Sequence, residues 1–146
     1  MASLVDSDAP VIFRASSKEA VPPGYKIVSD IPDHGDFTPD VSNFLTASNE
    51  SHISLEEMVR RLGVRGRKPT SFRHLEAVVK KSHLISPQCD LFSLVATGTW
   101  CIDEQGNERL AALVRDSSGA WVVPWIRVDS KFGNHENRID RALTVK

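Results

Sequence analysis

Lysine and arginine side chains are concentrated in one short part of this chain, where they could neutralise a polyanion. Eight of them fall between residues 58 and 81, against a single acidic residue, Glu76. This density favours nucleic-acid binding, because neutralised phosphates release their condensed counterions. Hydroxyl and imidazole groups in the same stretch can add hydrogen bonds to phosphates or base edges. The predicted contact residues are Arg60, Arg61, Arg65, Arg67, Lys68, Thr70, Ser71, Arg73, His74, Lys80 and Lys81.

The basic segment stands between two parts of the chain with a different charge balance. Residues 1–57 carry a net charge of −7, residues 58–81 carry +7, and residues 82–146 carry −1, which together give the overall −1. Such local asymmetry is a better guide to partners than the total. Two alternatives remain open. The basic segment is a solvated surface, or the acidic N-terminal third covers it within the same chain.

A shorter motif inside this segment resembles an AT-hook. It reads Arg65-Gly66-Arg67-Lys68-Pro69, whereas an AT-hook has a Gly-Arg-Pro core that places arginines in the narrow minor groove of A·T-rich DNA. Here Lys68 separates Arg67 from Pro69, which departs from that core. The alternative is an arginine-rich loop with a proline placed before a helix.

Catalytic and metal-binding patterns are weak by comparison. The histidines are scattered and form no HExxH or similar ligand pair on a helix. His34 has Asp33 and Asp36 beside it, which is either a metal or acid–base cluster or an ordinary Pro/Gly-rich turn. The two cysteines, Cys89 and Cys101, are expected to be inert thiols. We therefore expect no enzyme activity, no cofactor and no metal.

Two helices are predicted to carry the basic residues. Ser54-Leu55-Glu56-Glu57 is a capping box, and the apolar residues after it recur at helical spacing, so a helix is expected over 54–62 with Gly63 ending it. A second helix is expected to begin at Thr70 or Ser71 and to end by Ser86, because Pro87 follows. Its apolar face would leave Arg73, Lys80 and Lys81 outside.

The remainder of the chain is predicted to be extended or irregular. Strands are expected at 11–13, 25–28, 91–102, 108–115 and 120–128, with a short helix over 41–45 and a frayed helix around 137–143. The predicted fold class is α+β, comprising an irregular N-terminal segment and a basic, helix-turn-helix-like pair followed by a three-stranded antiparallel meander. Residues 1–146 would form one domain with 1–10 and 130–146 as mobile ends.

This order of elements resembles a winged helix, which implies docking of the second helix in the major groove. The leading hypothesis is a small regulatory or accessory protein that binds nucleic acid, with DNA favoured over RNA, through residues 60–81. The alternative is a non-catalytic protein-interaction module that presents the basic surface to an acidic protein. In that module Trp100, Trp121 and Trp125 could instead present an apolar surface, or remain in the core. A homodimer is also left open.

The compartment is expected to be the cytoplasm, without a membrane partner. No apolar run approaches the roughly 20 residues of a spanning helix, and the first residues have no signal-peptide pattern. The cysteines form no CxxC pair, which agrees with a reducing compartment.

Overall fold

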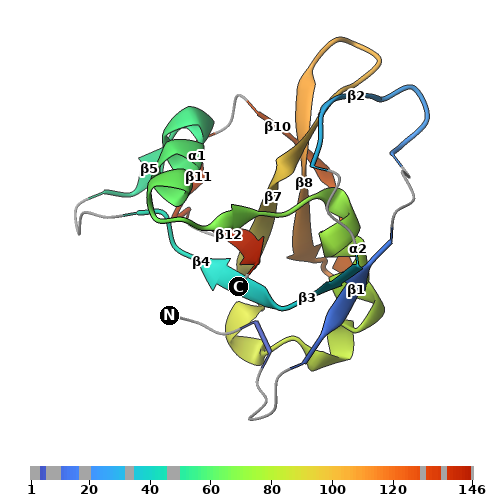
Figure 1. Ribbon diagram of the computed structural model, residues 1–146, viewed down its shortest axis with the longest axis vertical. Coiled ribbons are helices and arrows are strands. Elements are labelled where there is room, and N and C mark those ends of the chain that lie inside the picture. The colour runs from blue at the N-terminus through green and yellow to red at the C-terminus, as the bar shows by residue number, and fades with distance from the viewer. Residues whose placement is uncertain are drawn as a thin grey trace.

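The computed structural model is built around one large β-sheet (Figure 1). It describes residues 4–5, 11–16, 21–31, 35–45, 50–128, 131–135 and 138–145. Within these residues the sheet has eight strands, and its main path runs β10-β8-β7-β12-β4. The strands on this path are β4 (Pro39–Ser42), β7 (Phe92–Ile102), β8 (Glu108–Arg115), β10 (Trp125–Arg127) and β12 (Ile139–Val145).

Most neighbouring strands of this sheet are antiparallel, and β12 lies parallel to β7. Three short strands extend the sheet: β2 (Lys26–Ser29) pairs with the end of β7, β6 (Lys68–Pro69) with β12, and β9 (Trp121–Val122) with β8. Two further antiparallel pairs lie outside the large sheet. They are β1 (Phe13–Ala15) with β3 (Gly35–Phe37), and β5 (His52–Ile53) with β11 (Phe132–Gly133).

Two α-helices, α1 (Leu55–Val64) and α2 (Phe72–Lys80), cover the sheet in the described residues. Short 3₁₀ helices follow at Ser82–Leu84 and Pro87–Cys89. Successive residues of a strand point to opposite faces. Accordingly, alternate residues of β7 and β8 enter two different hydrophobic clusters. Leu94, Ala96, Ala111 and Leu113 pack in the cluster that contains α2, whereas Val95, Leu110 and Ala112 pack in the cluster that contains α1.

The two helices therefore lie on opposite faces of the central strands, as Figure 1 shows on either side of β7 and β8. The predicted fold class is wrong in this respect, because the helices do not form a helix-turn-helix-like pair. It is also wrong in its three-stranded meander, since the sheet is much larger and draws strands from both ends of the chain. The predicted N-terminal segment contributes β2 and β4 to this sheet.

Several local predictions are confirmed and others are wrong. The helix expected over 54–62, the start of the second helix, and the strands expected at 91–102 and 108–115 all form. The strand expected over 120–128 is divided into β9 and β10 at Val123 and Pro124. The helix expected over 41–45 is wrong because β4 occupies part of it, and the frayed helix around 137–143 is wrong because β12 begins at Ile139.

Candidate functional site

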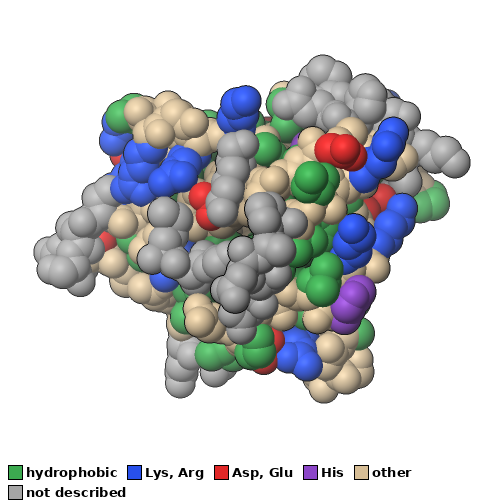
Figure 2. Space-filling view, turned by 60° about the horizontal axis from the view of Figure 1, so that its bottom comes forward, with side chains coloured by type: hydrophobic (Ala, Val, Ile, Leu, Met, Phe, Trp, Pro, Cys, Tyr) green, Lys and Arg blue, Asp and Glu red, His purple; other side chains and the backbone are tan. Residues whose placement is uncertain are grey.

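The predicted contact residues do not form one continuous surface. Figure 2 shows Lys and Arg side chains in separate groups on the left and right of the face in view. Arg60, Arg61 and Arg65 belong to α1 and its C-cap, whereas Lys80 ends α2 on the other face of the sheet. Lys81 follows directly, and its Nζ donates to the carbonyl of Ile12 at 3.2 Å. A helix-turn-helix that docks in one groove of DNA could therefore not bring the basic residues of α1 and those at the end of α2 to the same groove.

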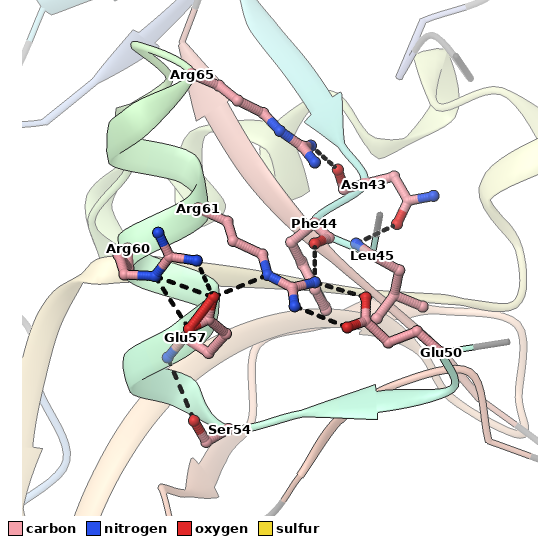
Figure 3. Close-up of polar contacts among 9 residues, drawn as sticks. All are labelled: Asn43, Phe44, Leu45, Glu50, Ser54, Glu57, Arg60, Arg61 and Arg65. Carbon is pink, nitrogen blue, oxygen red and sulfur yellow. Dashed lines mark hydrogen bonds and ion pairs between the residues drawn. The ribbon is translucent and has the colours of Figure 1, made fainter. Parts of the chain in front are cut away.

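The first turn of α1 places a carboxylate against two of the arginines (Figure 3). The Ser54 Oγ accepts from the Glu57 amide at 3.3 Å, which confirms one half of the predicted capping box. The Glu57 carboxylate does not complete the other half, and accepts instead from Arg60 and Arg61, each at 3.0 Å through Nε. Hydrogen bonds from Arg60 and then Arg61 lower the pKa of Glu57 to about 2.

Arg61 is bound on all sides by groups of the protein. Its Nη1 and Nη2 donate to the two carboxylate oxygens of Glu50 at 2.6 and 2.7 Å, and Nη1 also donates to the Phe44 carbonyl at 3.0 Å. Such a bidentate pair is among the stronger ionic contacts in proteins. Only 15% of the Arg61 side chain is exposed. Arg61 therefore connects α1 to the acidic N-terminal third and has little capacity left for an external ligand.

The AT-hook-like motif forms the C-cap of α1. The Gly66 amide donates to the Gly63 carbonyl at 3.0 Å and the Arg67 amide donates to the Leu62 carbonyl at 2.9 Å, which is the Schellman pattern. Gly66 has φ +70°, a conformation that residues with a Cβ rarely adopt. The prediction that Gly63 ends the helix is wrong, because the helix continues through it to Val64.

The other residues of this motif also have contacts within the protein. The Arg65 guanidinium donates to the Asn43 carbonyl at 2.5 Å (Figure 3), and Arg67 lies 3.4 Å from the Asp40 carboxylate. Lys68 and Pro69 form β6, which pairs with β12. The Arg65–Pro69 segment thus ends one helix and adds a strand to the sheet, while the side chains of Arg65 and Lys68 stay exposed.

The start of α2 is buried, which makes the predicted recognition helix wrong in its placement. Thr70 and Ser71 are fully buried, and Arg73 and His74 are 5% and 3% exposed. Thr70 donates to the Leu143 carbonyl at 2.7 Å, and the Ser71 amide donates to His74 Nδ1 at 3.0 Å. These four side chains therefore position α2 inside the molecule, and the prediction that Arg73 lies on the outer face is wrong.

Arg73 belongs to a network that joins α2 to β7. Its Nη1 lies 2.7 Å from an Asp30 carboxylate oxygen, and the other oxygen of Asp30 accepts from Thr99 Oγ1 at 2.8 Å. Thr99 Oγ1 in turn accepts from the Phe72 amide, the first of α2, at 3.2 Å. The strand passes so close that a Cβ on Gly98 would lie 2.6 Å from the Thr70 carbonyl oxygen. The N-terminal end of α2 is therefore covered by the protein and could not enter a groove of nucleic acid.

One exposed surface remains beside α1, and we call it the α1 outer surface. Val59 and Val64 are 41% and 76% exposed there, the Arg60 side chain is 63% exposed, and Gly63 leaves open space where a Cβ would stand. Arg65 and Lys68 are exposed at the end of the helix, where α1 contacts β6. The surface comprises Val59, Arg60, Gly63, Val64, Arg65 and Lys68.

The charges near this surface are only partly balanced. Three carboxylates, those of Asp40, Glu50 and Glu57, pair with Arg60, Arg61 and Arg67. Arg65 and Lys68 add two further positive charges that are in none of the ion pairs among the described residues, and the exposed Glu56 in the first turn of α1 adds one negative charge. The acidic N-terminal third thus neutralises much of the basic segment from within, as one of the two alternatives anticipated. Asp40 and Glu50 were not foreseen individually, although the −7 charge of residues 1–57 indicated such partners.

The remaining candidates for chemistry are separated or buried. Asp36 is exposed on β3, while Asp33 and His34 lie outside the described residues. Cys89 and Cys101 are buried and are not joined to each other by a disulfide, and burial raises the pKa of each thiol to about 11. Trp121 and Trp125 are partly buried against the α2 cluster, and Trp100 against the α1 cluster. Across the described ranges, neither helix is long and apolar enough to cross a membrane.

Comparisons with known proteins give no relative. No family model, no curated protein and no solved structure matches this chain.

Proposed function

We propose that this protein is a non-catalytic interaction module that binds an acidic, amphipathic segment of another protein on the α1 outer surface. The observation that carries the proposal is the exposure of Val59 and Val64 on α1, close to the exposed cations Arg65 and Lys68 at the end of the helix. An amphipathic helix that binds a surface needs apolar contacts spaced along it and charges of the opposite sign beside them.

The chemistry of this surface favours a protein over a nucleic acid. Exposed valines contribute apolar contact area, which a phosphate backbone cannot use. Gly63 has no side chain between them, so a partner chain could approach the helix backbone closely. The positive charge in excess is small, whereas tight nucleic-acid binding requires several unpaired cations along a groove. Nucleic-acid binding stays a prediction and is one arm of the test.

Fluorescence anisotropy with defined probes tests the proposal. The probe is a labelled helical peptide with leucines at helical spacing and glutamates beside them. A peptide in which serine replaces each leucine keeps the charge, and labelled random and A·T-rich DNA duplexes serve as polyanions. We expect the leucine peptide to bind, the serine peptide to bind several-fold more weakly, and the duplexes to bind more weakly than both.

Matched variants separate the surface from general effects. Val64→Ser should weaken binding of the leucine peptide by about five- to tenfold, given the roughly 1 kcal/mol or more carried by a buried valine. Val28→Ser is the control, because Val28 is likewise exposed, at 60%, but lies on β2. Arg65→Ala should weaken binding and reduce its salt dependence, whereas Lys80→Ala should not. Tighter binding to duplex than to peptide, or equal effects of Val64→Ser and Val28→Ser, would overturn the proposal.

We also propose a cytoplasmic setting for the protein. Cys89 and Cys101 are buried and are not joined to each other by a disulfide, which supports this setting, because reduced cysteines are usual in that compartment.

A further inference from the structure

Two histidines that are far apart in the sequence lie against each other in the structure. The ring centroids of His52 and His135 are 4.5 Å apart, with an angle of 46° between the ring planes. His52 belongs to β5, and His135 follows β11, the strand that pairs with β5. The Asn134 amide donates to the Ser51 carbonyl at 2.8 Å, so backbone hydrogen bonds hold the two segments that carry these rings beside each other.

Each imidazole has one nitrogen engaged by a neighbour. His135 Nε2 lies 3.1 Å from an Asp140 carboxylate oxygen and 3.1 Å from the Lys131 carbonyl oxygen. His52 Nδ1 lies 2.9 Å from Ser51 Oγ. Asp140 is itself held firmly, because its side chain is 1% exposed, accepts from the Gly133 amide at 3.1 Å and pairs with Arg138.

This arrangement is typical of histidines that bind a metal. A metal-binding histidine uses one ring nitrogen for the metal and donates the other N–H to a carboxylate, a carbonyl or another acceptor, which orients the ring. His135 has both a carboxylate and a carbonyl beside Nε2. Two imidazole nitrogens on one tetrahedral zinc lie about 3.3 Å apart, given Zn–N bonds of about 2.0–2.1 Å, so both must come from neighbouring rings, and the centroids of these two rings are 4.5 Å apart.

We propose that His52 and His135 together bind a divalent transition metal such as Zn²⁺, through Nε2 of His52 and Nδ1 of His135. Imidazole suits zinc, copper and nickel better than magnesium or calcium. In the described part of the chain, no group of three His, Cys, Asp or Glu side chains is arranged to hold a metal ion. The two imidazoles are therefore the protein ligands and water fills the other positions. Asp140 acts as a positioning residue behind His135.

Metal binding at this site would join two segments that are separated by 83 positions in the sequence. His52 also lies close to the start of α1, since Ser54 is the N-cap of that helix. A bound metal would hold β5 against β11 and would thereby stabilise the beginning of α1. A ligand that binds only the folded state raises its stability in proportion to the logarithm of the ligand concentration above Kd.

Isothermal titration with Zn²⁺ measures the affinity, and the absorption spectrum of Co²⁺ reports nitrogen ligation directly. We expect His52→Ala and His135→Ala each to weaken Zn²⁺ binding at least tenfold and to abolish the Co²⁺ spectrum. His83→Ala is the matched control, because His83 is an exposed histidine on a different element. Asp140→Asn should weaken binding by about 10- to 100-fold, as is usual for a carboxylate behind a metal-binding histidine.

Thermal unfolding provides a second, independent measurement. Zn²⁺ should raise the melting temperature of the unmodified chain and should leave that of the His52→Ala/His135→Ala variant unchanged. If Asp140→Asn fails to fold, Ser51→Ala tests the positioning of His52 instead and should weaken binding measurably. Equal Zn²⁺ affinity in the unmodified chain and the double variant, or an equal loss in His83→Ala, would overturn the proposal.

Discussion

Two glycines near the end of α1 should respond to the same substitution in opposite directions. Gly63 lies inside the helix and Gly66 is the left-handed residue of the Schellman cap, with φ +70°. A Cβ at either position meets nothing within 4 Å. The change to alanine therefore isolates backbone conformation from packing.

The expected magnitudes follow from that conformation. Gly63→Ala should stabilise the protein by roughly 0.5–1 kcal/mol, because glycine costs about that much in a helix relative to alanine. Gly66→Ala should destabilise it by about 1 kcal/mol, since the left-handed conformation costs an L-residue about 1–2 kcal/mol and the stiffer unfolded chain returns part of this. The two variants should thus differ by about 1.5–2 kcal/mol.

Urea unfolding of the two variants and the parent, followed by circular dichroism, measures these differences. At equal denaturant dependence, the midpoint should rise for Gly63→Ala and fall for Gly66→Ala. The melting temperatures should move in the same directions, by about 2–4 °C per kcal/mol. A neutral Gly66→Ala combined with a destabilising Gly63→Ala would show that the helix ends at Gly63, and would refute the Schellman assignment.

Three other predictions concern residues whose roles the structure reassigns. Arg73→Ala should lower the free energy of unfolding by about 3–5 kcal/mol, because the substitution leaves Asp30 without its buried partner. In the same denaturation assay, the control Lys80→Ala should change the free energy of unfolding by less than about 0.5 kcal/mol. Arg60 and Arg61 lower the pKa of Glu57 from 4.5 to about 2, so the contribution of the Glu57 carboxylate to stability is complete above about pH 4.5 and is lost as the pH falls towards 2. Glu57→Gln should therefore flatten the pH dependence of the free energy of unfolding between these values. A titration midpoint near 4.5 for Glu57, measured by NMR, would contradict the prediction. Cys89 and Cys101 are buried with pKa values of about 11, so a thiol reagent at pH 8 should label neither in the folded protein and both in urea; rapid labelling of the folded protein would contradict their burial.

The elements with a clear local pattern could be predicted from the sequence. The α1 helix has an N-cap serine and apolar residues at helical spacing, and β7 and β8 end at an evident turn. The sequence also contains a pattern that indicates helices on both faces of the central strands. Leu94-Val95-Ala96 and Leu110 to Leu113 are apolar at successive positions, which is typical of strands buried on both faces. Such strands require other elements to pack on both faces of the sheet, which argues against a fold that places both helices on one face.

The strands at the ends of the sheet could not be predicted in the same way. Residues 139–145 alternate polar and apolar side chains too weakly to distinguish a strand from a helix, and their partners are remote in the sequence. The candidate site depended equally on remote contacts. Whether Arg61 and Arg73 face solvent is decided by Glu50 and Asp30, which no local pattern connects to them.

The position of β12 between β7 and β4 determines when this chain can fold. Ser42 and Thr144 form a hydrogen bond of 2.8 Å across 102 residues, so β4 gains this neighbour only after all the residues between them have been synthesised. Pairings of such long range make folding slow, because the chain loses the entropy of closing a long loop before the stabilising contacts can form. Until β12 arrives, β7 offers an open edge to other chains. Until residues 139–145 become available, this edge of β7 therefore favours aggregation of the nascent chain.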